Sequence, residues 1–525
     1  MAATLPPSIF NDVVGPVMRG PSSSHSAASV RIGQMARDLC DGDPERVLVE
    51  VDTMGSLATT HESQGSDMGL FGGLLGWPAD DERLPESAAA LKAAGVELEI
   101  RIAELHDPHP NTYRLTLWKG GCEHRLIAIS TGGGMIEVID IDGHKVRMFG
   151  DYAATLLEVD GDGAAISEEL AEWADEVHVS GDSPAMVVVN GQSFLDQATI
   201  AKLPGIRRVR RIRAVLPVGS SKGMAVPFLH ASEMLAANDA TNRKLSDFAL
   251  DYETARGSIA PADVLQEMRK IHGIVTKGIE IGLAGTEYAD RILPRQSHNF
   301  QAMLESGKLH DGGILNKAIL YVSALMEVKS SMGVIVAAPT AGSCATFPAT
   351  CVAAAEGMQA SEEQTLRAML SAGLIGVFVT TRSSFAAEVG GCQAETGAGA
   401  AMAAAALVEL GGGTRRFTAV RRAGDGAATS RGDDASEPRV EGAGGLALAR
   451  AVHAGERDGD PEAGLPEPDL RLEELLDDAH VRAVCRVCRP ARGAQRIVER
   501  VARHRRQVRV RVAIDGAPKR LRERV

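Results

Sequence analysis

Residues 155–189 read TLLEVDGDGAAISEELAEWADEVHVSGDSPAMVVV. Apolar runs in and just after this stretch predict four strands, at 155–159, 176–179, 185–189 and 209–218. Helical spacing predicts two helices, at 165–174 and 194–202. Together these segments follow the order βαββαβ, which predicts a compact α/β module.

This order is typical of ferredoxin-like modules of the ACT type, which often bind amino acids. Upstream, apolar patterns predict strands at 47–52, 96–102, 112–118 and 126–130, and a hairpin of 136–141 with 145–148 around Asp142-Gly143. Beyond Gly219 the spacing is helical, at 314–332, 361–379 and 399–410. Ser258 is a cap candidate for a further helix that begins near Pro261. We therefore expect an α+β protein with a helical C-terminal part.

Composition narrows the possible partners and compartment. A net charge of −13 argues against nucleic acid as the main partner. No run of about 18 apolar residues occurs, which argues against a membrane span. The N-terminus lacks the charged and apolar regions of a secretory signal, so we expect a cytoplasmic protein. Seven cysteines in such a chain favour metal or redox chemistry over a disulfide framework.

The segment 415–525 differs from the rest of the chain. It holds 23 arginines but one lysine, Lys519, and one aromatic residue, Phe417. With so little apolar bulk it is expected to be a poorly ordered appendage. The alternative is a reading frame shifted from about codon 415, and the amino-acid sequence leaves both open.

Two loops carry hydroxyl groups. Residues 20–26 read GPSSSHS, and 338–344 read APTAGSC. Hydroxyls and backbone N–H groups supply convergent donors for a small anionic group, so we expect one pocket built from both loops. A plain turn or helix N-cap is the alternative for the serine run.

Cys392 follows two glycines at the entry to an alanine-rich helix. A thiolate there suits a nucleophile or an iron–sulfur ligand, while a small core residue is the alternative. Cys344 is expected to line the pocket, and Cys40 and Cys122 to be packing residues. The CxxC of Cys485 and Cys488 is weak evidence for a metal site. The sequence contains neither a nucleotide-binding glycine motif nor a clear lysine motif for pyridoxal phosphate.

Taken together, the motifs resemble those of the iron–sulfur-dependent L-serine ammonia-lyases (L-serine dehydratases) of bacteria. The matching pieces are GPVM at 15–18 with the serine run, GSLA at 55–58, GGLLG at 72–76, TGGGMIEV at 131–138, APTAGSC, and CQAE at 392–395. The resemblance covers about residues 8–414. It implies a β-type domain at 1–154, an ACT-like module at 155–218, a helical α-type domain at 219–414 and an atypical segment at 415–525.

The resemblance also implies a chemistry: elimination of water from L-serine to give pyruvate and ammonia, without pyridoxal phosphate. A [4Fe–4S] cluster would act as Lewis acid, with Cys392 at the position of the first cluster cysteine. His25 and His61 become the candidate catalytic residues. The candidate substrate-binding residues are Ser22, Ser23, Ser24, Ser26, Thr340, Gly342 and Ser343. A small-molecule substrate, a homo-oligomer and no membrane or nucleic-acid partner are expected.

Two departures from the family pattern affect these expectations. Where the family usually has GHGTD, residues 63–67 read SQGSD, so Gln64 replaces the histidine and His61 lies three residues earlier. The CDPVAG motif with the family's further cluster cysteines does not occur. Since one cysteine cannot hold a cluster, the chain as written is expected to lack it and to be inactive. The alternatives are a non-catalytic serine-binding or regulatory protein, and an iron–sulfur lyase for threonine or cysteine.

Overall fold

The structure is a computed structural model that describes residues 5–238, 243–289, 291, 293–383, 385 and 392–413, with the backbone alone at Asn238, Cys392 and Gln393. All of 414–525 lies outside the described residues, and so do the predictions made for that segment, including those for Cys485 and Cys488. None of the described helices is long and apolar enough to cross a membrane.

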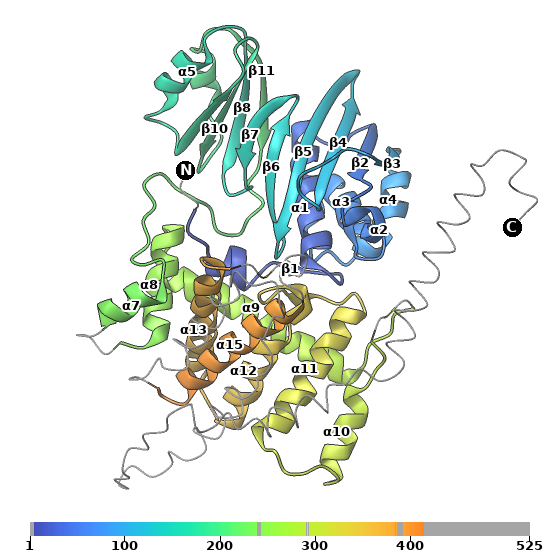
Figure 1. Cartoon of the computed structure of the whole chain (residues 1–525), viewed down its shortest axis with the longest axis vertical. Helices are drawn as coiled ribbons and strands as arrows, with labels where there is room; N and C mark the ends of the chain where they lie inside the picture. Colours follow the sequence, from blue (N-terminus) through green and yellow to red (C-terminus); the bar gives the residue numbers. More distant parts are fainter. Residues whose placement is uncertain are drawn as a thin grey trace, which may run out of the picture. The chain divides into compact units, whose positions relative to one another are not determined.

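A β-sheet-rich N-terminal part and a helical C-terminal part confirm the α+β class (Figure 1). The larger sheet has the order β3-β2-β4-β5-β6-β7. Its strands are β2 (Arg46–Asp52), β3 (Glu97–Ala103), β4 (Thr112–Lys119), β5 (Cys122–Gly132), β6 (Met135–Ile141) and β7 (His144–Met148). All of the strands predicted here are present. At the predicted hairpin, Asp142 and Gly143 have φ values of 53° and 87°, and positive φ at both central positions is typical of a type I′ turn.

Two helices of this part pack unusually closely: α1 (Ala28–Leu39) and α3 (Ser66–Leu74). Glycines at the contact explain the close approach, because a Cβ on Gly73 would lie 2.2 Å from the carbonyl oxygen of Val30. The buried face of α1 shares one core with the sheet. Two shorter helices complete this part, α2 (Leu57–Thr60) and α4 (Ser87–Ala93).

The second sheet has the order β11-β8-β10-β9 with antiparallel pairs. The elements are β8 (Ala153–Val159), α5 (Gly163–Leu170), β9 (Glu176–Ser180), β10 (Ala185–Gly191), α6 (Gln197–Ile200) and β11 (Ile206–Ile212). This confirms the βαββαβ order. The prediction that the last strand reaches residue 218 was wrong. The chain leaves the sheet because the Arg213 amide donates to Asp38 (3.0 Å) and the Val215 amide donates to the Gly150 carbonyl oxygen (2.7 Å).

The C-terminal part is helical. Its helices are α7 (Ala231–Asn238), α8 (Leu245–Gly257), α9 (Pro261–Ala284), α10 (Ser297–Glu305), α11 (Ile314–Ser330), α12 (Thr346–Gly357), α13 (Glu362–Thr380) and α15 (Cys392–Leu410). The helices predicted at 314–332 and 361–379 are confirmed, and α15 begins earlier than the predicted residue 399. The prediction that Ser258 caps α9 was wrong: Ala260 is the N-cap, while Ser258 ends α8 with a φ of 52°.

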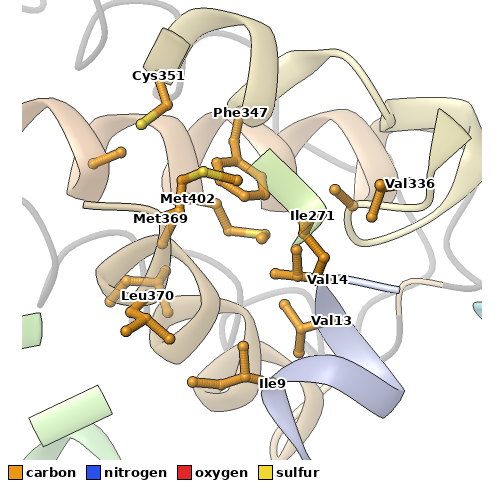
Figure 2. Packing of buried hydrophobic residues seen from close by; sticks show 14 of the residues in the cluster. Ile9, Val13, Val14, Ile271, Val336, Phe347, Cys351, Met369, Leu370 and Met402 are labelled. Atoms are coloured by element: carbon orange, nitrogen blue, oxygen red, sulfur yellow. The ribbon is translucent and has the colours of Figure 1, made fainter. Parts of the chain in front are cut away.

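The N-terminal segment packs into the helical core rather than against the large sheet (Figure 2). Its helical turn Ile9–Val13 lies against α13. Glycines on α13 make room for it: a Cβ on Gly376 would lie 2.0 Å from Val13 Cγ1, and one on Gly373 would lie 2.6 Å from Ile9 Cγ2. The core of the helical part is therefore completed by residues from the start of the chain.

Candidate active site

The serine run folds into a tight helical turn, Ser23–Ala27, that leads directly into α1. Ser26 Oγ donates to the Ser22 carbonyl oxygen (2.7 Å) and closes this turn. Gly20 has a φ of 105°, and a Cβ on it would lie 2.5 Å from Ser26 Oγ. The glycine ahead of the serines is thus required both by the backbone conformation and by the close approach of Ser26.

His25 is buried and hydrogen-bonded at both ring nitrogens. Thr60 Oγ1 lies 3.1 Å from Nε2 and itself donates to the Ser56 carbonyl oxygen (2.7 Å). Because a threonine hydroxyl has one proton, it must accept from Nε2–H. Nδ1, which lies 3.0 Å from Ser22 Oγ and 3.3 Å from Ser24 Oγ, is then the acceptor. The network therefore assigns the proton of neutral His25 to Nε2 and points Nδ1 at two hydroxyls.

Tertiary pairing brings the two hydroxyl loops together, as the sequence predicted. Strand β1 (Val17–Met18) pairs antiparallel with β12 (Ile335–Val336), directly before each loop. The Ala341 amide then donates to Ser23 Oγ (3.3 Å). The loops thus meet through the backbone as well as through a side chain.

Most of the candidate hydroxyls are buried in these loops. Ser343 Oγ donates to the Ala338 carbonyl oxygen (3.1 Å), and Ser23 and Ser26 have the bonds given above. Their hydroxyls shape the two loops, a role closer to the turn reading of the serine run. Ser22 is half-buried and Gly342 is exposed. Among the candidate substrate-binding residues, these two positions are the most exposed to solvent.

Residues in and next to the TGGG turn hydrogen-bond to the serine run and to helix α1, which follows it. Ser130 Oγ donates to the Ser24 carbonyl oxygen (2.7 Å), and buried Arg31 donates to the Gly134 carbonyl oxygen (2.5 Å). Burial lowers the pKa of Arg31 to about 10, although the negative charge of Asp12 opposes this. The motif therefore acts as scaffold for the loop.

His61 pairs with Asp67. His61 Nδ1 lies 2.9 and 2.8 Å from the two carboxylate oxygens, and both side chains are partly exposed. Burial raises the pKa of Asp67, and the hydrogen bond from His61 opposes the shift. A carboxylate at Nδ1 fixes the orientation of a histidine ring. The link from His61 to the serine run is its neighbour Thr60, which bonds His25.

The second loop contacts the start of α15. Thr340 Oγ1 donates to Glu395 Oε1 (2.5 Å). Sequence reasoning did not single out Glu395, Thr60 or Asp67 as site residues. Glu395 stands in the CQAE motif and Asp67 in SQGSD, so both signals were present, whereas nothing in the sequence distinguished Thr60 from Thr59.

Cysteine placement bears on the expected cluster. Cys344 does not line an opening: its side chain is fully buried, its sulfur lies 3.8 Å from Met326 Sδ, and burial raises its thiol pKa to about 11. Cys351 also lies in the core (Figure 2), and burial raises its thiol pKa to about 12. Cys40 is a packing residue as predicted, whereas the same prediction for Cys122 was wrong, because it is exposed where β5 begins.

Within the described part of the chain, no three His, Cys, Asp or Glu side chains converge as metal ligands. The described residues therefore do not fit a [4Fe–4S] cluster. Cys392 does stand at the first position of α15, as predicted, and its side chain is outside the described part.

Comparison with known proteins gives the same family for both parts of the chain. The family model "Serine dehydratase alpha chain" matches residues 221–423. The "Probable L-serine dehydratase, beta chain" of Bacillus subtilis is 35% identical over 217 residues, covering 39% of this chain and 97% of the relative.

Two further relatives extend this picture. The "Probable L-serine dehydratase, alpha chain" of the same organism is 32% identical over 187 residues, covering 36% of this chain and 62% of the relative. The "L-serine dehydratase" of Haemophilus influenzae is 22% identical over 410 residues, covering 75% of this chain and 77% of the relative. The chain thus belongs to the iron–sulfur L-serine dehydratase family of lyases, with β-chain and α-chain regions joined in one polypeptide.

Proposed function

We propose that this protein binds L-serine between the serine run and the APTAGSC loop, and that it is an L-serine ammonia-lyase. The observation that carries the proposal is the bond from the Ala341 amide to Ser23 Oγ, which joins two motifs 318 positions apart in the chain. Loops of neutral donors suit a small zwitterion whose carboxylate needs several hydrogen bonds.

In the proposed reaction a base removes the proton from Cα, the β-hydroxyl leaves as water, and a Cα–Cβ double bond forms. The resulting enamine tautomerises to an imine, which water hydrolyses to pyruvate and ammonia. His25 and His61 are the proposed proton-transfer residues. His25 has an acceptor nitrogen next to two hydroxyls, and His61 has its ring oriented by Asp67.

We also propose the domain limits 1–154, 155–218 and 219–414, with an ACT-like module in the middle. Support comes from separate cores: one cluster of buried residues belongs to the module, and the others belong mainly to the large sheet and to the helices. The antiparallel order β11-β8-β10-β9 suits a ferredoxin-like module.

The proposal assigns no reaction step to the iron–sulfur cluster of the family. When bound, a [4Fe–4S] cluster supplies a Lewis acid for the departing hydroxyl. The described cysteines do not fit it, so we assign it no step here. The second candidate function, a serine-binding protein without turnover, rests on the sequence, in which the CDPVAG motif does not occur.

Anaerobic purification followed by iron, sulfide and pyruvate assays separates the two functions. Iron and sulfide together with pyruvate formed from L-serine support the lyase. A colourless protein that binds L-serine in calorimetry and forms no pyruvate supports the binding protein. A protein that neither binds nor converts L-serine contradicts both.

A further inference from the structure

Recognition of a free amino acid requires a group that meets its ammonium. An ammonium has three donors and no acceptor, and its strongest partner is a carboxylate. Glu395 is an acidic side chain that hydrogen-bonds to one of the two hydroxyl loops, through Thr340. Asp67, a second carboxylate in this part of the protein, is paired with His61.

Gly342 is what allows the Glu395 carboxylate to approach the loop. A Cβ on Gly342 would lie 2.8 Å from each of the two Glu395 oxygens, closer than real Cβ contacts allow. Gly342 is exposed, and Glu395 beside it is half-buried, so this part of the loop is open to solvent. Thr340, which is nearly buried, orients this carboxylate by donating to Oε1.

We infer that Glu395 binds the ammonium group of the amino-acid substrate and selects amino acids over hydroxy acids. A carboxylate has about four acceptor positions, so the bond from Thr340 is compatible with bonds to an ammonium. The inference rests on the proposed serine site. With Glu395, the proposed serine site contains a charged group in addition to the hydroxyls and backbone amides of the two loops.

The test compares L-serine with glycerate, which has a hydroxyl in place of the ammonium, by titration calorimetry on the full chain. Glu395→Gln keeps the size of the side chain and an oxygen that accepts from Thr340, but removes the charge. We expect its affinity for L-serine to fall at least about tenfold, while its affinity for glycerate is unchanged or higher.

Gly342→Ala provides a second variant that leaves the charge in place. Its Cβ displaces the carboxylate, so we expect a selective loss of L-serine affinity here too. Gly397→Ala is the matched control. Gly397 lies in α15, as Glu395 does, and a Cβ on it would have no neighbouring atom within 4 Å. Its affinities should equal those of the wild type.

Three results would overturn the inference. If Glu395→Gln binds L-serine as the wild type does, Glu395 does not bind the ammonium although the serine site stands. Equal loss of L-serine and glycerate would mean general damage to the loop. If the wild type itself does not bind L-serine, the proposed function fails and the inference falls with it.

Discussion

At the scale of single residues, the site depends on neutral hydrogen bonds that give His25 one tautomer. Thr60 is the acceptor that decides it, because its own proton is used by the Ser56 carbonyl oxygen. The pattern GPSSSHS shows where hydroxyls are concentrated in the sequence. Thr60, which lies on another helix, decides which ring nitrogen of His25 can accept a proton.

Replacing this acceptor should destabilise the fold. Thr60→Val keeps the shape of the side chain but removes the hydroxyl that accepts from the Nε2–H of buried His25, which we expect to cost about 1–3 kcal/mol of unfolding free energy in urea denaturation. Thr59→Val, at an exposed position of the same turn, is the control and should change it by less than about 0.5 kcal/mol. Equal effects of the two variants would contradict the assigned role of Thr60.

Glu253, which binds the N-terminal segment, makes the stability of the fold depend on pH. It accepts from Ser8 Oγ and from the Ile9 amide (2.7 Å), and burial raises its pKa from 4.5 to about 7. Arg256 and the two donors oppose the shift, and burial also raises the pKa of neighbouring Asp12.

Because the folded pKa lies above the unfolded value, Glu253 stabilises the fold fully below pH 4.5 and loses this effect as pH rises through 7. We expect this one group to lower the unfolding free energy by about 3 kcal/mol over that window. Glu253→Gln should show a much shallower fall, and exposed Glu97→Gln should follow the wild type. Equal changes of stability with pH in the wild type and in Glu253→Gln would count against this assignment.

At the scale of elements, glycines decide which helices approach each other. The turn Ile9–Val13 packs on α13 where Gly373 and Gly376 leave space. Both glycines lie inside a helix, where glycine costs stability relative to alanine, so their benefit is the tertiary contact.

Gly376→Ala should therefore destabilise the protein, because the new Cβ would lie 2.0 Å from Val13 Cγ1. We expect a loss of about 1–3 kcal/mol in thermal or chemical unfolding. Gly273→Ala in α9 is the matched control: a Cβ there meets nothing within 4 Å, and we expect a gain of about 0.5–1 kcal/mol from helix propensity. The prediction fails if both variants shift stability in the same direction.

At the scale of the whole molecule, the first residues of the chain link its two parts. Asn11 is fully buried, donates from Nδ2 to the Val218 carbonyl oxygen (2.7 Å) and accepts from the Val218 amide (3.0 Å). These paired bonds connect the N-terminal segment to the chain just before the helical part.

Asn11→Ala leaves both backbone groups of Val218 without a partner. We expect a loss of about 2–4 kcal/mol in unfolding free energy and weaker stabilisation by L-serine, since the same segment leads into the serine run. Asn316→Ala removes a comparable but exposed bond to the His310 carbonyl oxygen (2.8 Å) and serves as the control. An Asn11→Ala variant as stable as this control would show that the link is dispensable.

The sequence alone predicted the strands of the large sheet, the element order of the second sheet and several helices of the C-terminal part. Alternation predicted the strands of both sheets, Asp142-Gly143 predicted its turn, and the small-residue motifs predicted two loops that meet. These features are local, because each depends on neighbours within a few positions. The ends of strands and helices were less predictable where they depend on a residue far away in the sequence. Strand β11, for example, ends where the Arg213 amide donates to Asp38.

Tertiary structure alone decided what the candidate residues contact. It placed Cys344 in the core, turned the hydroxyls of Ser26 and Ser343 onto backbone carbonyls, and brought Glu395 to the Thr340 loop. A sequence states which side chains can donate or accept. Whether a hydroxyl bonds its own loop, or a thiol meets a thioether, depends on atoms brought together by chain folding over hundreds of residues.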